Sequence, residues 1–304
     1  LLQYRNGAPP LSNNPNASLY PWSQRRLTYT TSHPSPFPRY GAAVNSVSSK
    51  EGDIYLMGGL INSSTVKGDL WLIEGGSPNL ACYPLATTAE GPGPRVGHAA
   101  LLVGNAFIVF GGDTKIEETD ILDETLYLLN TCKAHLLENK ADLDLGCLLP
   151  PLSNAAMVTR TPSWTAATGR YGHTLNILGS KIYVFGGQVE GLFMNDLSAF
   201  DLNQLQNPNN RWEILISNDP APPQGKVPQP RTNHTMVTYG DKHTCELHFF
   251  SPMTVAALAE TFRFGGTNGY QWFNDVWSYD PVTNSWTLLD CIGYIPSPRE
   301  GHAA

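Results

Sequence analysis

One phrase recurs five times along the chain, each time as an Arg that leads into a short apolar segment. The copies are PRYGAAV at Pro38, PRVGHAALLV at Pro94, GRYGHTLNIL at Gly169, PRTNHTMV at Pro230 and PREGHAA at Pro298. A unit repeated at such intervals is the signature of a propeller or a solenoid, in which each unit packs on the next. The chain is therefore expected to fold as a series of similar supersecondary units.

The residues between the repeated phrase and the Gly pair that follows it predict two strands. Residues 174–178 alternate in polarity, and residues 181–185 are β-branched and aromatic, so we expect a hairpin with a tight turn at Gly179-Ser180. A Gly pair then follows, where the chain turns sharply or another backbone comes close. The same pairs follow the first four copies of the phrase: Gly58-Gly59, Gly111-Gly112, Gly186-Gly187 and Gly265-Gly266.

Aromatic side chains mark two further strands in the repeat. GDLWLIE, ETLYLLN, NDLSAFDL and NDVWSYDP each predict a third strand, and RWEILI and SWTLLD predict a fourth, with a weaker copy at residues 163–165. Large aromatics of this kind are expected to fill the wedges between neighbouring units. These side chains are Trp71, Tyr127, Trp212, Trp277 and Trp286.

This order of features resembles the kelch repeat, in which each repeat forms one four-stranded blade of a β-propeller. The resemblance implies an all-β chain: an incomplete propeller over residues 21–304, after a disordered segment at 1–20, with about four blades and the start of a fifth from a ring of six. Blades open near residues 36, 92, 167, 228 and 296. Such a partial ring would expose edges and be poorly soluble.

Three segments stand outside the regular repeat. PWSQRRLTYT has the layout of a fourth strand, so we expect Trp22 to Thr30 to supply the outer strand of the closing blade. Irregular insertions cover about 132–160 and 243–261. The second interrupts what the other repeats run through as one strand, so it is interpreted either as a bulging surface loop or as an error of the gene model.

A cation recurs once per repeat, at Arg39, Arg95, Arg170, Arg231 and Arg299. A ring of guanidiniums along one rim of the channel would bind carboxylates of an acidic peptide. The alternative is that each Arg binds backbone carbonyls and joins neighbouring blades. Two other repeated sets are interpreted as structural. The histidines are expected to form hydrogen bonds with neighbouring loops: His98, His173, His234 and His302. The aspartates are expected to cap turns: Asp69, Asp196, Asp201, Asp275 and Asp280.

Composition narrows the classes of function. A net charge of −7 without a basic run argues against nucleic acid, and the apolar runs are too short for a membrane helix. Five cysteines, an odd number, favour reduced thiols in the cytoplasm. We find no catalytic triad, paired carboxylates, phosphate loop or metal-ligand set, and therefore predict no catalytic residues, no metal and no cofactor.

The segments PWSQRRL, GRYGHTLNILGSKIYVFGGQVEG, WFNDVWSYDP and CIGYIPSPREGHAA resemble the propeller of fungal Tea-type cell-end marker proteins. That resemblance implies a non-catalytic interaction scaffold at the cell cortex of growing tips and at microtubule ends. Its partners would be polarity factors and proteins that organise microtubule plus ends or actin. Oligomerisation, if any, would be expected through a coiled coil that is absent here.

Two other classes of kelch protein are weighed against this one. An enzyme of the galactose oxidase type needs a copper site of Tyr and His with a Cys-Tyr crosslink, and no matching set is found. A substrate adaptor of a ubiquitin ligase carries a BTB or F-box segment, for which residues 1–35 are too short and too rich in Pro and Asn.

Overall fold

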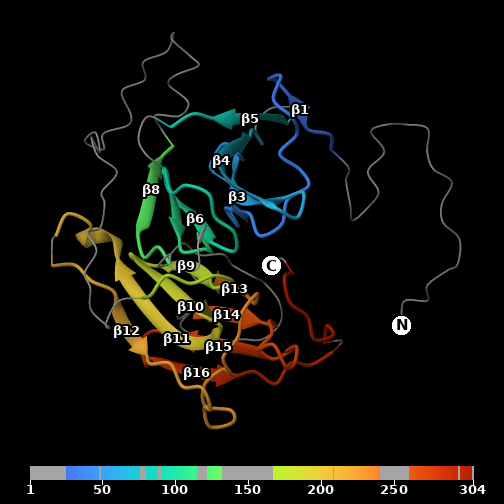
Figure 1. Ribbon diagram of the computed structural model, residues 1–304. Helices are drawn as coiled ribbons and strands as arrows, with labels where there is room; N and C mark the ends of the chain where they lie inside the picture. Colours follow the sequence, from blue (N-terminus) through green and yellow to red (C-terminus); the bar gives the residue numbers. More distant parts are fainter. Residues whose placement is uncertain are drawn as a thin grey trace, which may run out of the picture.

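The computed structural model describes residues 25–47, 49–75, 80–87, 91–114, 122–131, 167–207, 209–239, 260–293 and 295–302. Within these residues the chain is all-β, as expected, apart from one 3-10 turn, η1 (Leu202–Gln204). Successive strands form antiparallel hairpins and group into four sheets (Figure 1). Each sheet corresponds to one copy of the repeated phrase and is called a blade below.

The blades have the following strands. Blade 1 contains β2 (Ala43–Val44), β3 (Ile54–Ile61), β4 (Thr65–Ile73) and β5 (Ala81–Leu85); blade 2 contains β6 (Ala99–Val103), β7 (Ala106–Phe110) and β8 (Leu126–Asn130). Blade 3 contains β9 (Thr174–Leu178), β10 (Lys181–Val189), β11 (Leu192–Asp201) and β12 (Glu213–Ile216); blade 4 contains β13 (Thr235–Tyr239), β14 (Glu260–Phe264), β15 (Val276–Asp280) and β16 (Ser285–Leu288).

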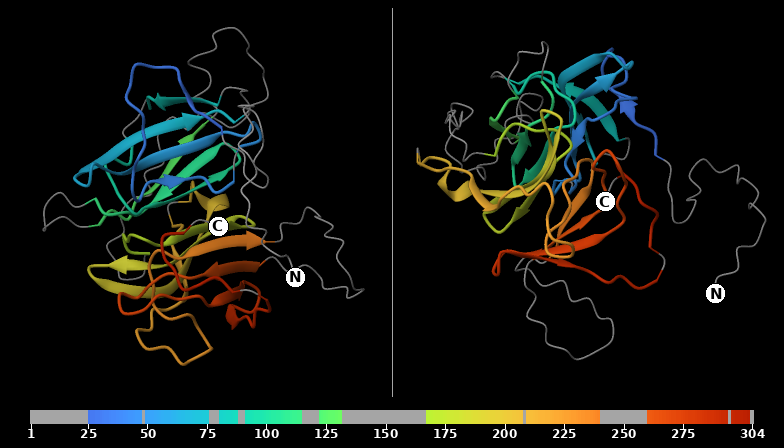
Figure 2. Two further views of the ribbon diagram at one scale, coloured as in Figure 1. Left: turned by 90° about the vertical axis from the view of Figure 1, so that its right-hand side faces the viewer. Right: turned by 60° about the horizontal axis from the view of Figure 1, so that its bottom comes forward.

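The first strands of successive blades lie next to one another. Strand β2 contacts β6, β6 contacts β9, and β9 contacts β13. The four blades therefore follow in order around a shared centre, with these strands innermost (Figure 2). This is the arrangement of consecutive blades in a β-propeller.

Blade 3 is buried on both faces, because blade 2 packs on one side of it and blade 4 on the other. In β10, Ile182 and Val184 pack toward blade 2, whereas Tyr183 and Phe185 pack toward blade 4. All four side chains are at most 5% exposed. The alternating residues of β10 thus enter two different cores, which explains why residues 182–185 form a continuous apolar run.

The hairpin predicted at residues 174–185 is present, with Leu178 paired to Lys181 across the turn. The Gly pair, however, does not end the second strand in every blade. Strand β10 continues through Gly186 and Gly187 to Val189, and the register with β11 shifts at this point, as in a β-bulge. Both glycines have positive φ, 62° and 94°, a conformation that favours Gly.

The expected role of residues 22–30 in a closing blade is not what the structure shows. Of this segment, only residues 25–30 are described, and Thr28–Tyr29 form β1, which runs parallel to β5 in blade 1. The Thr28 amide donates to the Leu80 carbonyl oxygen at 3.1 Å. The segment therefore pairs with the outer backbone edge of β5 and becomes the edge strand of this sheet.

The insertion before the fourth Gly pair does not interrupt a strand. Strands β13 and β14 pair in unbroken register from Thr235–Phe264 to Tyr239–Glu260. Residues 240–259 thus connect the two ends of a hairpin, where blade 3 has the two-residue turn Gly179-Ser180, and Glu260 and Thr261 belong to β14 itself. A lengthened hairpin connection leaves the ladder intact. Residues 1–20, the insertion at 132–160 and Trp164 lie outside the described residues.

Candidate functional site

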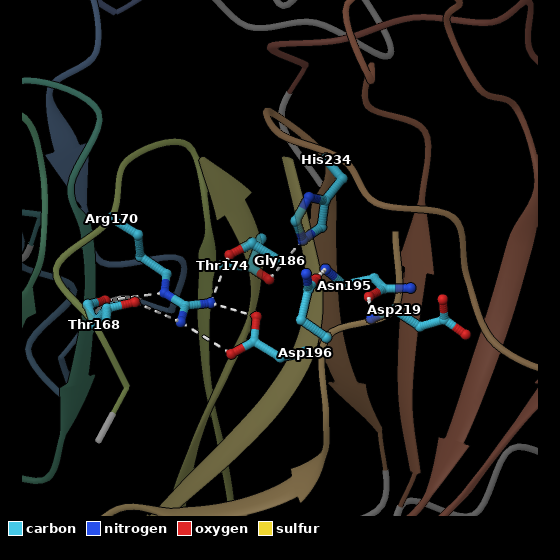
Figure 3. A network of polar contacts seen from close by, with 9 residues as sticks. Thr168, Arg170, Thr174, Gly186, Asn195, Asp196, Asp219 and His234 are labelled. Carbon is cyan, nitrogen blue, oxygen red and sulfur yellow. Dashed lines mark hydrogen bonds and ion pairs between the residues drawn. The ribbon is translucent and has the colours of Figure 1, made fainter. Parts of the chain in front are cut away.

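Four of the five repeated arginines each pair with an Asp that lies within the third strand of the same blade or shortly before it. Arg170 binds Asp196 through two hydrogen bonds, Nη1 to Oδ1 at 2.7 Å and Nη2 to Oδ2 at 2.9 Å (Figure 3). Its Nη1 also donates to the carbonyl oxygen of Gly186 at 3.0 Å, and its Nε to that of Thr168 at 3.1 Å. The planar guanidinium is therefore fully used inside blade 3.

Similar pairs recur in the other three blades, with two hydrogen bonds to the carboxylate in blades 1 and 4 and one in blade 2. The pairs are Arg39–Asp69 at 2.8 Å, Arg95–Asp123 at 3.0 Å and Arg231–Asp275 at 2.6 Å. In every blade Nη1 donates to the carbonyl oxygen of the first Gly of the pair. The arginine side chains are at most 3% exposed in all four blades.

This geometry corrects the rim of partner-binding arginines for four of its five members. Arg39, Arg95, Arg170 and Arg231 point into their blades, with their donors bound and their charge paired, so they offer no free guanidinium to a peptide carboxylate. Arg299 differs, because its side chain is exposed and bonds only to Ser297 within the described residues.

The four arginines from Arg95 onward also join their blades to the preceding ones through the backbone. The carbonyl oxygen of Arg231 accepts the amide of Gly187 at 2.8 Å. The Cβ of an alanine at Gly186 would lie 2.9 Å from the same oxygen, so only glycine allows the two backbones to approach so closely. The equivalent bonds run from Gly59 to Arg95, from Gly112 to Arg170 and from Gly266 to Arg299.

The repeated histidines lie in the same joints. His234 packs edge-on against the Phe185 ring of the preceding blade, 5.2 Å between centroids, and its Nε2 is 3.0 Å from the Thr174 hydroxyl (Figure 3). Burial, with the nearby guanidinium charges of Arg263 and Arg231, holds the pKa of His234 well below its usual value. Burial and the neighbouring arginine likewise lower the pKa of His98 and of His173 to about 3.

The repeated aspartates divide into two groups. Asp201 and Asp280 cap turns as expected, accepting the amides of Asn203 at 2.9 Å and Val282 at 2.8 Å. Asp69, Asp196 and Asp275 instead bind the repeated arginines, which the turn-capping interpretation missed. Burial opposes ionisation of Asp275, but the hydrogen bonds and charge of Arg231 outweigh it, and the carboxyl pKa lies below its usual value.

The aromatic side chains of the third and fourth strands lie in or beside the interfaces between blades. Trp277 and Trp286 pack against blade 3, and Trp212 packs 5.1 Å from the Phe110 ring of blade 2. Tyr127 contributes to the interface between blades 1 and 2, whereas Trp71 lies on the face of blade 1 that points away from blade 2. The indole nitrogens of Trp71 and Trp277 donate to Asp69 and Asp275, at 2.7 and 2.6 Å.

Two exposed aromatic side chains lie on the connection between β14 and β15. Tyr270 is 96% exposed and Trp272 is 59% exposed, and the Trp272 indole donates to a carboxylate oxygen of Glu300 at 3.2 Å. A Cβ added at Gly269, beside them, would lie 3.0 Å from the Phe193 ring of blade 3. The sequence interpretation missed this surface, although residues 270–272 place two aromatics in a connection where blade 3 has the short turn Glu190-Gly191.

Two further observations concern only the residues that the structure describes. No group of three His, Cys, Asp or Glu side chains in them is close enough to hold a metal ion. No helix among them has the length and the apolar character needed to cross a membrane.

Comparisons with known proteins agree with this architecture. The Kelch motif matches residues 169–215 and 264–290, which include most of blade 3 and the second half of blade 4. Tip elongation aberrant protein 1 of Schizosaccharomyces pombe is 36% identical over 273 residues, covering 90% of this chain and 19% of that protein. Kelch repeat-containing protein 2 of Saccharomyces cerevisiae is 32% identical over 275 residues, covering 88% of this chain and 25% of that protein.

Tip elongation aberrant protein 3 of Schizosaccharomyces pombe is similar as well, 26% identical over 79% of this chain and 20% of its own length. The chain thus spans a quarter or less of these three relatives. The repeated joints, the blade topology and the similarity across most of the residues lead to one conclusion. The chain belongs to the kelch-repeat family, and it is similar over most of its length to the tip elongation aberrant proteins of Schizosaccharomyces pombe.

Proposed function

We propose that this chain is the non-catalytic interaction domain of a cell-end marker, which acts in polarised growth and in organising the cytoskeleton at the cell cortex. The observation that carries the proposal is the 36% identity, over 90% of the chain, to a protein named for its role in tip elongation. Its partners would be polarity factors and proteins that organise microtubule plus ends or actin. It would work in the cytoplasm, at growing tips and on microtubule ends.

The exposed connection between β14 and β15 supports a protein-binding role. Tyr270 and Trp272 present large apolar rings to solvent, and aromatic side chains are enriched where proteins meet. Because the four buried arginines are occupied within their blades, this aromatic surface is a better candidate for partner contact than the arginine ring.

The test is to image the fluorescently tagged full-length protein in fungal cells and to recover its partners by affinity purification with mass spectrometry. We expect enrichment at cell tips and recovery of polarity or cytoskeletal proteins. A Tyr270→Ser, Trp272→Ser variant should lose partners while it stays folded. The matched control is Val282→Ser, because Val282 is 76% exposed in the turn between β15 and β16, at the other end of blade 4.

Uniform cytoplasmic fluorescence without recovery of such proteins would overturn the cell-end assignment. If the wild type reaches the tips and the aromatic variant recovers the same partners, the assignment stands and the contact surface lies elsewhere on the propeller.

A further inference from the structure

Arg263 occupies a position in blade 4 where other blades have aliphatic side chains. The register pairs Arg263 with Trp277, just as it pairs Leu56 with Trp71 in blade 1. In blade 2 the same register position is held by Val109, opposite Tyr127. Arg263 is 1% exposed, as deeply buried as its aliphatic counterparts. A charged guanidinium therefore lies in a layer that elsewhere is apolar.

The surroundings of this guanidinium are aromatic and belong to the interface between blades 3 and 4. Its Cζ atom lies 5.1 Å from the ring centroid of Phe185, 5.7 Å from that of Trp286 and 5.9 Å from that of Trp277. The three nitrogens, Nε, Nη1 and Nη2, have no hydrogen-bond partner among the described residues. The ring faces offset part of the lost hydration, but they accept none of the five N–H groups in a conventional hydrogen bond.

Among the residues that the structure describes, the charges in this layer do not balance. The nearest carboxylate, Asp275, has Oδ2 3.7 Å from Nη2 of Arg263, beyond hydrogen-bond distance. Asp275 already accepts two hydrogen bonds from Arg231, at 2.6 and 2.8 Å, and one from the Trp277 indole. Two buried guanidiniums thus share one carboxylate, and an arginine keeps its proton in a protein. The neighbouring His234 has a depressed pKa and adds no negative charge.

Blade 1 shows the balanced form of the same layer. There Arg39 pairs with Asp69, the Trp71 indole donates to that carboxylate, and the side chain above it is Leu56. Blade 4 has the same pair and the same indole but one further positive charge. Burial of an unpaired charge is costly, and a counter-ion is the simplest compensation.

Two more donors without partners face the same side of blade 4. Thr261 is two residues before Arg263 on β14, so both side chains lie on one face. Thr261 pairs with Tyr279, and Tyr279 pairs with Trp286, which places the row Thr261, Tyr279 and Trp286 on that face as well. The Thr261 hydroxyl and the Trp286 Nε1 have no hydrogen-bond partner among the described residues.

We propose that a small monovalent anion of the halide class, such as chloride, binds between blades 3 and 4 against the guanidinium of Arg263. The anion would accept N–H groups of Arg263 and neutralise the extra charge, and the Thr261 hydroxyl and Trp286 indole are the further donors on that face. A water molecule could accept these hydrogen bonds but would leave the charge uncompensated. The enclosed position favours a monatomic ion over a phosphate or a peptide carboxylate, since the side chain of Arg263 is 0% exposed.

The matched variant is Arg263→Leu, which reproduces the layer of blade 1. Thermal and urea unfolding of the full-length protein would be compared in sodium chloride, sodium bromide and sodium gluconate at one ionic strength, so that screening is constant. Well above the dissociation constant, tenfold more chloride should raise the ratio of folded to unfolded wild type about tenfold. The Arg263→Leu protein should show no difference between chloride and gluconate.

Two measurements on the wild type alone keep the test independent of how the variant folds. Line broadening of the chloride-35 NMR signal should appear on adding protein and be removed by competing bromide. Anomalous diffraction from crystals grown in bromide should show a peak beside Arg263. Equal halide dependence in both proteins, or crystals without a bromide peak in this interface, would overturn the proposal and leave water as the partner of the guanidinium.

Discussion

The backbone amide of Gly187 in blade 3 donates a hydrogen bond to the carbonyl oxygen of Arg231 in blade 4, 2.8 Å away. Arg231 at the same time uses its side chain to bind Asp275 and the Gly265 carbonyl oxygen of its own blade. One residue therefore connects the interior of a blade with the blade before it. The same contacts recur in each described joint. Substitution of these residues should therefore destabilise the packing of whole blades and not only one strand.

Replacement of Gly187 by alanine should be more destabilising than replacement of Gly191. Both have positive φ, 94° and 84°, so both pay a backbone strain of about 1 kcal/mol. An added Cβ at Gly187 would meet the Cβ of His173 at 2.8 Å and the Tyr171 carbonyl oxygen at 2.9 Å, whereas nothing lies within 4 Å at Gly191. We expect a further loss of about 1–3 kcal/mol at Gly187, measured by urea unfolding. Equal losses would show that crowding in the joint is unimportant.

Replacement of Asp196 should leave the buried positive charge of Arg170 without a partner. Arg170 and Asp196 are 1% and 10% exposed, and breaking such a pair costs about 3–5 kcal/mol. The Asp196→Leu protein should therefore unfold at much lower urea, and the double variant Arg170→Leu, Asp196→Leu should recover part of the loss. A double-mutant cycle measures the difference. Additive losses would contradict a direct energetic link between the two side chains.

Stability should fall between pH 7 and pH 5. Burial, followed by the charge of Arg95 or Arg170, lowers the pKa of His98 and His173 to about 3 from an ordinary 6.5. Below pH 6.5 the unfolded chain binds protons that the folded chain excludes, so acid favours unfolding until the folded pKa is reached. Each histidine should contribute a loss of about 2 kcal/mol over this interval.

Urea midpoints at several pH values would test this, with His173→Asn as the variant whose pH dependence is shallower. The lowered carboxyl pKa of Asp275 does not interfere, because its contribution is lost only as pH falls below 3.8, the ordinary value for Asp. Stability that is flat or rises from pH 7 to pH 5 would contradict the burial of neutral imidazoles.

Truncation of Trp286 to alanine should open a cavity between blades 3 and 4. Its ring is 6% exposed and lies 5.0 Å from Phe185 and 5.1 Å from Tyr279, so we expect a loss of about 3–5 kcal/mol. Trp272→Ala is the matched control, since that side chain is 59% exposed and should change stability by about 0.5 kcal/mol or less. Calorimetric unfolding of both variants would separate core packing from surface aromaticity.

The repeated strands could be predicted from the sequence because the pattern of polar and apolar residues agreed with the positions of the turn-forming residues. Alternation at residues 174–178, the turn at Gly179-Ser180 and the apolar run that follows all indicate one hairpin, and the structure confirms it. The fourth strand of blade 1, β5, was missed because Ala81–Leu85 lacks the Trp that marks β12 and β16. Its position is determined by pairing with β4, and this pairing cannot be recognised from the residues of β5 alone.

The roles of charged residues were harder to predict, because they depend on which way a side chain points. One Arg per blade is equally consistent with a ring of exposed cations and with buried arginines that bind groups inside the blades. The distinction lies in Asp69 and its counterparts, tens of residues away in sequence, whose carboxylates meet the arginines only after the third strand has folded back. Arg263 went unnoticed for a related reason, since burial of a lone cation is a property of two packed blades.

The inner loops carry one more repeated contact: the amide of Gly97 donates to the Gly41 carbonyl oxygen, Gly172 to Gly97, Asn233 to Gly172 and Gly301 to Asn233. Donor and acceptor sit on different atoms of equivalent residues, so each step is head-to-tail, a heterologous contact in the language of protein assemblies. Such a contact can be repeated without limit, so it does not determine how many blades the ring contains. The number of blades in a ring built this way is therefore set by the angle at which the aromatic wedges hold neighbouring blades, and not by the hydrogen bonds that join them.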